Sequence, residues 1–260
     1  MLSIKHITVE YNNVPTLIDF DLHVKKGEII SLVGESGSGK TTVIRAVLGL
    51  LPQEGEITEG DIIYHGNSLP AKTEAEWMEL RGSKISMIFQ DCGAMLNPIR
   101  RIGPQFIESI RVHRKISKKE ANEKAVHMLE AVNLPDGENI MHSYPFQLSG
   151  GMRQRVGIAM SMVFQPDLLL ADEPTSALDV TTQAQIVKQM IQLREKNGTS
   201  IILVTHNLGV AAYMSDRIVV MQNGRIVETG TKEEIIRNPQ TAYTKKLLAS
   251  VPTMEGIDYV

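Results

Sequence analysis

The chain has 260 residues, of which 42% are hydrophobic and 22% charged, a composition typical of a globular protein with a substantial core. Its formal net charge of -3, from 27 basic and 30 acidic residues, argues against a basic nucleic-acid-binding surface and against an acidic disordered tail. The single cysteine, Cys92, excludes an internal disulfide and fits a reducing compartment.

The N-terminal segment alternates apolar and polar residues. This pattern predicts a strand over 4–11, with Ile4, His6 and Thr8 on one face, and a second strand over 16–24 that ends at a turn. The segment lacks the basic and then apolar plan of a signal peptide, and no uncharged apolar run is long enough to cross a bilayer. We therefore expect a soluble chain that reaches a membrane only through a partner.

Buried strands and helices are expected to alternate along the rest of the chain, which indicates an α/β fold with a mostly helical insertion near 88–160. Short, continuous apolar runs predict strands buried on both faces, as in a parallel sheet. These strands are expected at 29–33, 168–172 and 200–204, and shorter strands and turns at 55–69. Helical periodicity is expected over 42–51, where Pro52 would end the helix, and over 120–132 and 181–198. Asn223 and Gly224 between two alternating runs predict a hairpin.

Residues 34–41 match the phosphate-binding pattern G-x-x-x-x-G-K-[ST] in full, between a predicted buried strand and a predicted helix. A loop of this kind points backbone N–H groups at phosphate oxygens, and the following helix adds the positive end of its dipole. Lys40 is expected to reach the outer phosphates, and the Thr41 hydroxyl to bind Mg²⁺. The predicted nucleotide-binding residues of this loop are Gly34, Glu35, Ser36, Gly37, Ser38, Gly39, Lys40, Thr41 and Thr42.

Polar side chains follow three of the apolar strands. Asp172 is placed to bind Mg²⁺, and Glu173 is a candidate general base for attack on the terminal phosphate. His206 and Gln90 also follow apolar strands, where ligands of open parallel sheets bind. Each of these residues alone would be weak evidence of a site, but together with a complete phosphate loop they predict a nucleotide-hydrolysing one.

With these residues in place, the chain resembles the nucleotide-binding subunit of an ATP-binding-cassette (ABC) transporter from residue 2 to about residue 252. The motifs follow the family's order and are Tyr11, the phosphate loop, Gln90, Leu-Ser-Gly-Gly-Met (148–152), Leu-Leu-Leu-Ala-Asp-Glu-Pro (168–174), Ser-Ala-Leu-Asp (176–179) and His206. The resemblance implies an α/β P-loop NTPase cassette with a RecA-like core, an antiparallel β subdomain and a helical signature subdomain. We expect the core with its β subdomain at 1–88 and 161–235, the helical subdomain at 89–160 and a short C-terminal segment at 236–260.

The resemblance also implies site roles, with ATP and Mg²⁺ as cofactors. Tyr11 would stack on adenine, although an edge-strand tyrosine is the simpler reading. Gln90 would bind the metal and sense the γ-phosphate, while His206 would hold that phosphate. Ser149, Gly150 and Gly151 would contact an ATP held by the opposite subunit, and Asp179 would lie at the dimer interface. The catalytic residues are thus expected to be Glu173, His206 and Gln90, and the metal ligands Thr41, Gln90 and Asp172.

Within the family, the closing segment "NPQTAYTKKLLASVP" and the Met at position 152 resemble the importers of the peptide/nickel group. Expected partners are two transmembrane permease subunits, a second and non-identical ATPase in a head-to-tail dimer and, indirectly, an extracytoplasmic solute-binding protein, with no nucleic acid. The chain would act at the cytoplasmic face of the cell membrane. The solute stays open between a small peptide, nickel and another metal chelate. Longer relatives carry a cysteine-bearing segment proposed to bind an iron–sulfur cluster, which the single cysteine here cannot form.

The alternative function is that of an ABC-type ATPase doing mechanical work away from membranes. The interval between Thr41 and Ser149 has no sustained heptads, as a repair-type coiled coil would require, and the chain has one cassette where ribosome-associated relatives have two. A P-loop kinase or GTPase would not account for the Leu-Ser-Gly-Gly-Met motif. We therefore expect an Mg²⁺-dependent transport ATPase.

Overall fold

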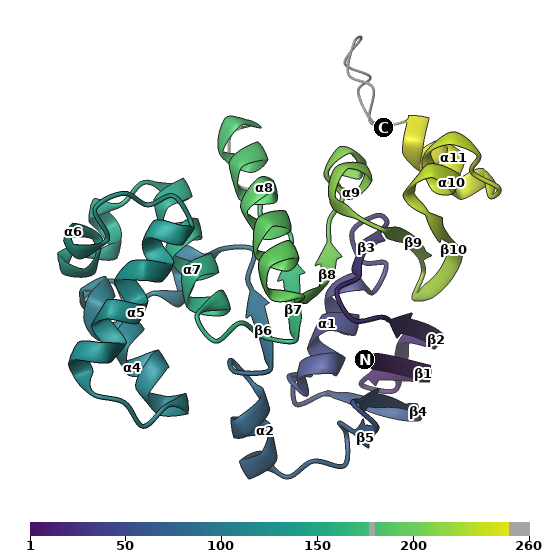
Figure 1. Ribbon diagram of the computed structural model, residues 1–260. Helices are drawn as coiled ribbons and strands as arrows, with labels where there is room; N and C mark the ends of the chain where they lie inside the picture. The colour runs from purple at the N-terminus through teal and green to yellow at the C-terminus, as the bar shows by residue number, and fades with distance from the viewer. Residues whose placement is uncertain (177–179, 250–260) are drawn as a thin grey trace. The chain divides into compact units, whose positions relative to one another are not determined.

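A computed structural model describes residues 1–176 and 180–249 of the chain (Figure 1). The residues form two compact units, of which the first comprises Met1–Met78 and Ser200–Val260, and the second Glu79–Thr199. The helix α2 (Glu74–Leu80) spans the boundary between them in sequence.

The first unit contains an antiparallel sheet in the order β2-β1-β4-β5. Its strands are β1 (Leu2–Tyr11), β2 (Val14–Val24), β4 (Gly55–Tyr64) and β5 (Asn67–Ser68). The predicted strict alternation in β1 is wrong, because a register shift between Ile4 and Ile7 places both of these side chains in the core and leaves His6 exposed. His6 and Asp19 have positive φ angles at facing irregularities of β1 and β2, and their side chains lie 2.7 Å apart.

The same unit contains three parallel strands with β3 in the centre. They are β3 (Ile29–Val33), β8 (Ser200–Val204) and β9 (Arg217–Gln222), and β10 (Arg225–Thr231) adds an antiparallel edge to β9. Every residue of β3 and β8 is buried, which confirms the prediction from their continuous apolar runs.

The helices of the first unit follow these strands. They are α1 (Lys40–Leu48), α9 (Leu208–Met214), α10 (Lys232–Arg237) and α11 (Ala242–Ala249). The prediction of a helix that extends to Leu51 and is ended by Pro52 is wrong, because α1 ends at Leu48. Gly49 adopts a left-handed φ of 61°, and the N–H groups of Gly49 and Leu50 donate to Ala46 and Arg45, so that a glycine cap ends the helix earlier.

The second unit contains two parallel strands, β6 (Ile85–Ile88) and β7 (Leu168–Asp172), and is otherwise largely helical. Its helices are α3 (Cys92–Met95), α4 (Ile102–His113), α5 (Lys118–Ala131), α6 (Gly137–His142), the 3-10 turn η1 (Pro145–Gln147), α7 (Gly150–Met162) and α8 (Val180–Asn197). Most of these helices lie between β6 and β7 in the chain, as the predicted helical insertion requires. Ser117 and Glu120 form a capping box that starts α5.

The two compact units are defined by contacts between residues, and they do not test the division expected from the sequence. The expected division into 1–88 with 161–235, 89–160 and 236–260 therefore stays a prediction. In residues 1–176 and 180–249, none of the helices is both long and apolar enough to span a membrane.

Candidate functional site

The phosphate loop follows β3 in the first unit, and its glycines are required by space and by backbone conformation. Gly34 has φ 154°, and a β-carbon there would collide with the carbonyl oxygen of Met221. Gly39 has φ 99°, and a β-carbon there would lie 2.6 Å from Leu17 Cδ2. Larger residues at these two positions would force the loop to open. The sequence pattern therefore has a direct steric cause.

Lys40 folds back over this loop. Its Nζ donates to the carbonyl oxygens of Gly34 at 2.8 Å and Glu35 at 2.7 Å, and to the Ser38 hydroxyl at 3.2 Å. The Lys40 side chain is 7% exposed, so the phosphate loop surrounds a largely buried ammonium group. A positive charge held in this way is suited to neutralise phosphate oxygens.

The N-terminus of α1 fits a phosphate group. Gly39 is its N-cap and supplies no side-chain hydrogen bond, and the first turn carries no acidic residue. The first N–H groups of a helix need partners, and a bound anion satisfies them and the helix dipole together. The residues present in this loop therefore fit the phosphates of ATP.

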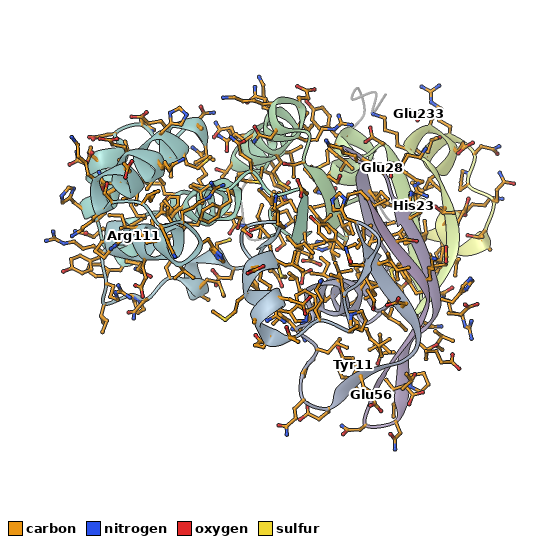
Figure 2. All side chains as sticks on the ribbon, turned by 60° about the horizontal axis from the view of Figure 1, so that its bottom comes forward. Tyr11, His23, Glu28, Glu56, Arg111 and Glu233 are labelled. Carbon is orange, nitrogen blue, oxygen red and sulfur yellow. The ribbon has the colours of Figure 1, made fainter. Side chains whose placement is uncertain are left out.

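Two further predicted residues lie in the first unit. His206 follows β8, whose Val204 pairs with Leu32 of β3, so His206 and the phosphate loop leave the same edge of the sheet. Tyr11 ends β1 beside Glu56 (Figure 2), and its ring covers Gly55 of β4. The adjoining strand β2 contacts Gly39 through Leu17.

In the second unit, the carboxyl ends of β6 and β7 bring three predicted residues together. Ile88 pairs with Ala171, so that Gln90 and the Asp172–Glu173 pair follow neighbouring strands. The Gln90 Nε2 group donates to Glu173 Oε2 at 3.3 Å and to the Ser176 hydroxyl at 3.4 Å. Glu173 itself has φ 43°, a conformation that costs energy for a residue with a side chain and that clusters at functional sites.

This donor set suits Mg²⁺. Among the described residues, no group of three or more His, Cys, Asp or Glu side chains gathers to hold a metal. Mg²⁺ keeps several waters and takes one or two carboxylates together with phosphate oxygens, so the Asp172 carboxylate and the Gln90 amide of this unit are groups of the kind that this ion accepts.

The Ser-Gly-Gly motif begins helix α7. Ser149 is the N-cap, and its hydroxyl accepts from the Met152 N–H at 3.3 Å. A β-carbon on Gly150 would meet nothing within 4 Å, whereas one on Gly151 would lie 2.9 Å from Thr182 of α8. The first turn of α7 is therefore open on the Gly150 side and holds no acidic residue, as an anion contact requires. Asp179 lies outside the described residues.

Sequence reasoning missed Gln154, a buried residue of α7. Its Nε2 group donates to the carbonyl oxygens of Pro174 at 2.7 Å and Phe89 at 3.4 Å, and its Oε1 accepts from the Cys92 N–H at 3.3 Å. Gln154 thus connects helix α7, which begins at the Ser-Gly-Gly motif, to the segments that carry Gln90 and Glu173. No local signal marks it, because its partners are distant in sequence.

Cys92 is unsuited to surface chemistry. Its side chain is 3% exposed and packs where Gly157 leaves room, and burial raises the pKa of its thiol to about 11. A crosslink from this chain to a partner would therefore require a cysteine introduced at an exposed position.

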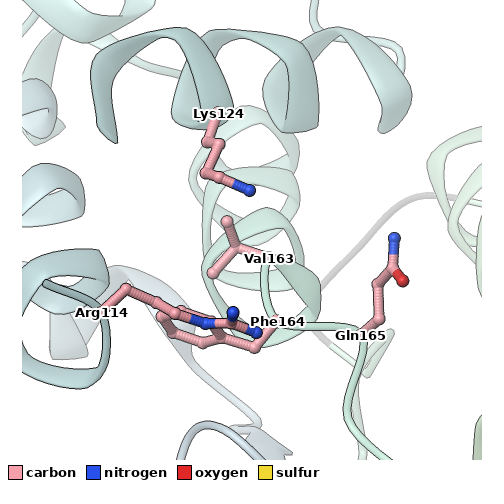
Figure 3. A pocket seen from close by; sticks show the side chains of 5 residues that line it. All are labelled: Arg114, Lys124, Val163, Phe164 and Gln165. Atoms are coloured by element: carbon pink, nitrogen blue, oxygen red, sulfur yellow. The ribbon is translucent and has the colours of Figure 1, made fainter. Parts of the chain in front are cut away.

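A pocket of about 140 Å³ at the end of α7 contains none of the predicted site residues (Figure 3). Its lining is Arg114, Lys124, Val163, Phe164 and Gln165. The two cations lie where α7 ends at Met162, and the negative end of a helix dipole favours cations there. Their presence has a structural cause and does not require a ligand.

Comparison with known proteins agrees with a nucleotide-binding cassette. A family model described as "ABC transporter" matches residues 17–176, and one described as "Oligopeptide/dipeptide transporter, C-terminal region" matches 227–258. The chain is 45% identical over 98% of its length to the oligopeptide transport ATP-binding protein OppD of Bacillus subtilis (strain 168), and covers 73% of that protein. It is 43% identical over 98% of its length to the dipeptide transport ATP-binding protein DppD of Lactococcus lactis subsp. cremoris (strain MG1363), and covers 75% of it. Among solved structures, a dimeric ATP-binding cassette in a post-hydrolysis state with ADP and Pi superimposes with a TM-score of 0.79 at 28% identity, over 89% of this chain and 99% of that one.

Proposed function

The chain belongs to the ABC transporter family, and on that premise we propose that it is the ATP-hydrolysing subunit of an importer for small peptides. The observation that carries the peptide assignment is the 45% identity to an oligopeptide transport subunit over 98% of the chain. The match of residues 227–258 to the C-terminal region of oligopeptide/dipeptide transporters supports it. Nickel has no such support among these relatives, and neither has mechanical work away from a membrane.

For the reaction, we assign the first unit to binding. The N–H groups of the phosphate loop and α1 would hold the phosphates, Lys40 would neutralise them, and His206 would contact the γ-phosphate. Tyr11 would stack on the adenine ring. These residues position the nucleotide and do not themselves break a bond.

We assign the second unit to the chemistry. Asp172 and Gln90 would hold Mg²⁺ together with Thr41 of the phosphate loop, and the ion, when bound, would supply positive charge against the phosphates of ATP. Glu173 would take the proton of the attacking water as general base, and the hydrogen bond from Gln90 orients its carboxylate. Ser149, Gly150 and Gly151 would face the ATP of a second ATPase subunit, and Asp179 would lie at that interface.

We further infer that the chain works in an assembly. The dimeric state of the solved cassette supports a pair of ATPase subunits. We expect this pair to be head to tail, with a second ATPase that is not identical to this chain. Two permease subunits would attach the pair to the cytoplasmic face of the membrane and would receive peptide from a solute-binding protein.

The test of the catalytic assignment is Glu173→Gln in the assembled transporter. Removal of a general base costs about 10²- to 10⁴-fold in rate, so we expect ATP turnover to fall at least about 100-fold with ATP affinity retained. Glu130→Gln, a change at an exposed position of α5, is the matched control and should behave as wild type. Turnover of Glu173→Gln near the wild-type rate would reject the role.

The test of the solute uses the same assembly in membrane vesicles. Labelled dipeptides and oligopeptides should accumulate in an ATP-dependent manner, and Glu173→Gln should abolish the accumulation. Uptake of Ni²⁺ without uptake of peptides would overturn the peptide assignment and leave the ATPase assignment intact.

A further inference from the structure

The C-terminal segment touches the phosphate loop through one tyrosine. Tyr243 lies in the first turn of α11, and its hydroxyl accepts a hydrogen bond from the Glu35 N–H at 3.1 Å. The two residues are 208 positions apart in the chain. Glu35 is the first residue after Gly34, so this bond reaches the start of the loop.

The contact extends through Glu35 to Lys40, the lysine of the phosphate loop. The Glu35 carbonyl oxygen accepts from Lys40 Nζ at 2.7 Å and from the Ser38 N–H at 3.2 Å. Glu35 is therefore held at both ends. Its N–H group donates to the Tyr243 hydroxyl, and its carbonyl oxygen accepts from the Lys40 ammonium group. This carbonyl oxygen is thus one of the loop acceptors that hold the Lys40 ammonium group, together with the Gly34 carbonyl oxygen and the Ser38 hydroxyl.

The start of α11 is fixed to β10 by a single carboxylate. Glu228 accepts from the N–H groups of Gln240 at 2.7 Å and Thr241 at 3.0 Å, and from the Thr241 hydroxyl at 2.9 Å. Burial raises the pKa of Glu228, but these hydrogen bonds and that of Thr244 outweigh burial and lower it to about 2, so the carboxylate is ionised at neutral pH. Such charge-assisted bonds are stronger than neutral ones.

The Tyr243 ring also has a packing role. It lies against the core cluster that includes Val33, the last residue of β3, and Leu208 of α9. The ring would keep this contact without its hydroxyl, so packing and hydrogen bonding can be separated by a change to phenylalanine.

We propose that Tyr243 is a positioning residue of the ATP site, whose hydroxyl fixes Glu35 and through it the carbonyl oxygens that hold Lys40. A loop arranged before ATP arrives loses less freedom on binding, so the bond supports ATP affinity. The inference rests on the proposed function, because it assigns Tyr243 to the same ATP site. It makes α11 part of the nucleotide site.

The test is Tyr243→Phe, compared with Tyr213→Phe, a change at a 62% exposed tyrosine of α9 in the same unit. The loss of one net hydrogen bond predicts a rise in the KM for ATP of roughly two- to tenfold, with kcat within about twofold of wild type. The Glu35 amide should also exchange its hydrogen faster by a similar factor. Glu228→Gln should move both quantities in the same direction, because it loosens the start of α11.

Two outcomes would overturn the inference. In the first, Tyr243→Phe has the wild-type KM for ATP and the wild-type exchange rate at the Glu35 amide, and only Tyr243→Ala is defective. Tyr243 would then act by packing alone. A fall in kcat alone would indicate loss of folded protein in place of loss of positioning. If the wild-type chain bound no ATP, the proposed function would fall too, whereas normal ATP binding with an inert Tyr243→Phe would remove this inference alone.

Discussion

At the scale of single residues, the second unit depends on one buried amide. Gln154 donates to the carbonyl groups of Phe89 and Pro174 and accepts from the N–H group of Cys92, and these residues flank the predicted catalytic residues Gln90 and Glu173 in the chain. A side chain with both a donor and an acceptor is needed there, because both kinds of backbone group face it. Gln154 therefore links helix α7, which starts at the Ser-Gly-Gly motif, by hydrogen bonds to the segments that carry Gln90 and Glu173.

Gln154→Leu tests this coupling. The substitution removes the Gln154 partner of the Pro174 carbonyl and of the Cys92 N–H, and leaves the Phe89 carbonyl with the weak Cys92 thiol donor, so we expect the free energy of unfolding to fall by about 2–4 kcal/mol. Urea denaturation followed by circular dichroism measures it. Gln192→Leu, at an exposed position of α8, should change stability by less than about 0.5 kcal/mol. Equal changes in the free energy of unfolding for the two substitutions would show that the hydrogen bonds of Gln154 do not stabilise the fold.

At the scale of elements, the β9–β10 hairpin supports the phosphate loop. Asn223 and Gly224 form its turn with φ angles of 49° and 76°. The Gly224 N–H donates to the Ser38 carbonyl oxygen at 3.2 Å, and its own carbonyl oxygen accepts from the Ile18 N–H at 3.0 Å. This turn, which the sequence marks only as a hairpin connection, is thus hydrogen-bonded both to the phosphate loop and to β2.

Gly224→Ala should damage this arrangement. A β-carbon there would meet the Thr16 carbonyl oxygen and would also suffer the positive φ, so we expect a loss of about 2–4 kcal/mol of stability and weaker ATP binding. Gly66→Ala is the matched control, because Gly66 has φ 84° in a turn where a β-carbon meets nothing within 4 Å. It should lose only about 1 kcal/mol, with ATP affinity unchanged. Thermal unfolding and a nucleotide-binding titration separate the two variants, and similar losses in both would contradict the steric argument.

At the scale of the whole molecule, we expect the segment from Gln90 to Ile102 to contact a membrane subunit. Within it, Ile99 is 83% and Met95 58% exposed, and neither side chain is covered in the single chain. Large exposed apolar residues of this kind are typical of interaction surfaces. The buried Cys92 thiol explains why a native-cysteine experiment would not detect the contact.

Ile99→Cys supplies the reactive thiol that the contact needs. We expect it to form a crosslink to a co-expressed permease subunit without ATP, whereas the wild-type chain with Cys92 alone should form none. Val112→Cys, at a 66% exposed position of α4, should react equally with a soluble maleimide and shows that exposure alone does not produce the adduct. A complex in which Ile99→Cys reacts with maleimide but never with the permease would refute the predicted surface.

The sequence by itself determined the features that depend on neighbouring residues. The apolar runs of β3, β7 and β8 predict buried strands, the glycines of the phosphate loop allow positive φ angles, and the Asn223–Gly224 pair forms its turn locally. The tertiary structure decided the features that depend on distant partners. The irregularity that turns His6 outward follows from pairing with β2, the burial of Cys92 follows from packing on Gly157, and Tyr243 meets the phosphate loop across 208 positions. Local pattern fixes backbone conformation, but only the folded chain brings a donor and an acceptor that are far apart in sequence to within hydrogen-bonding distance.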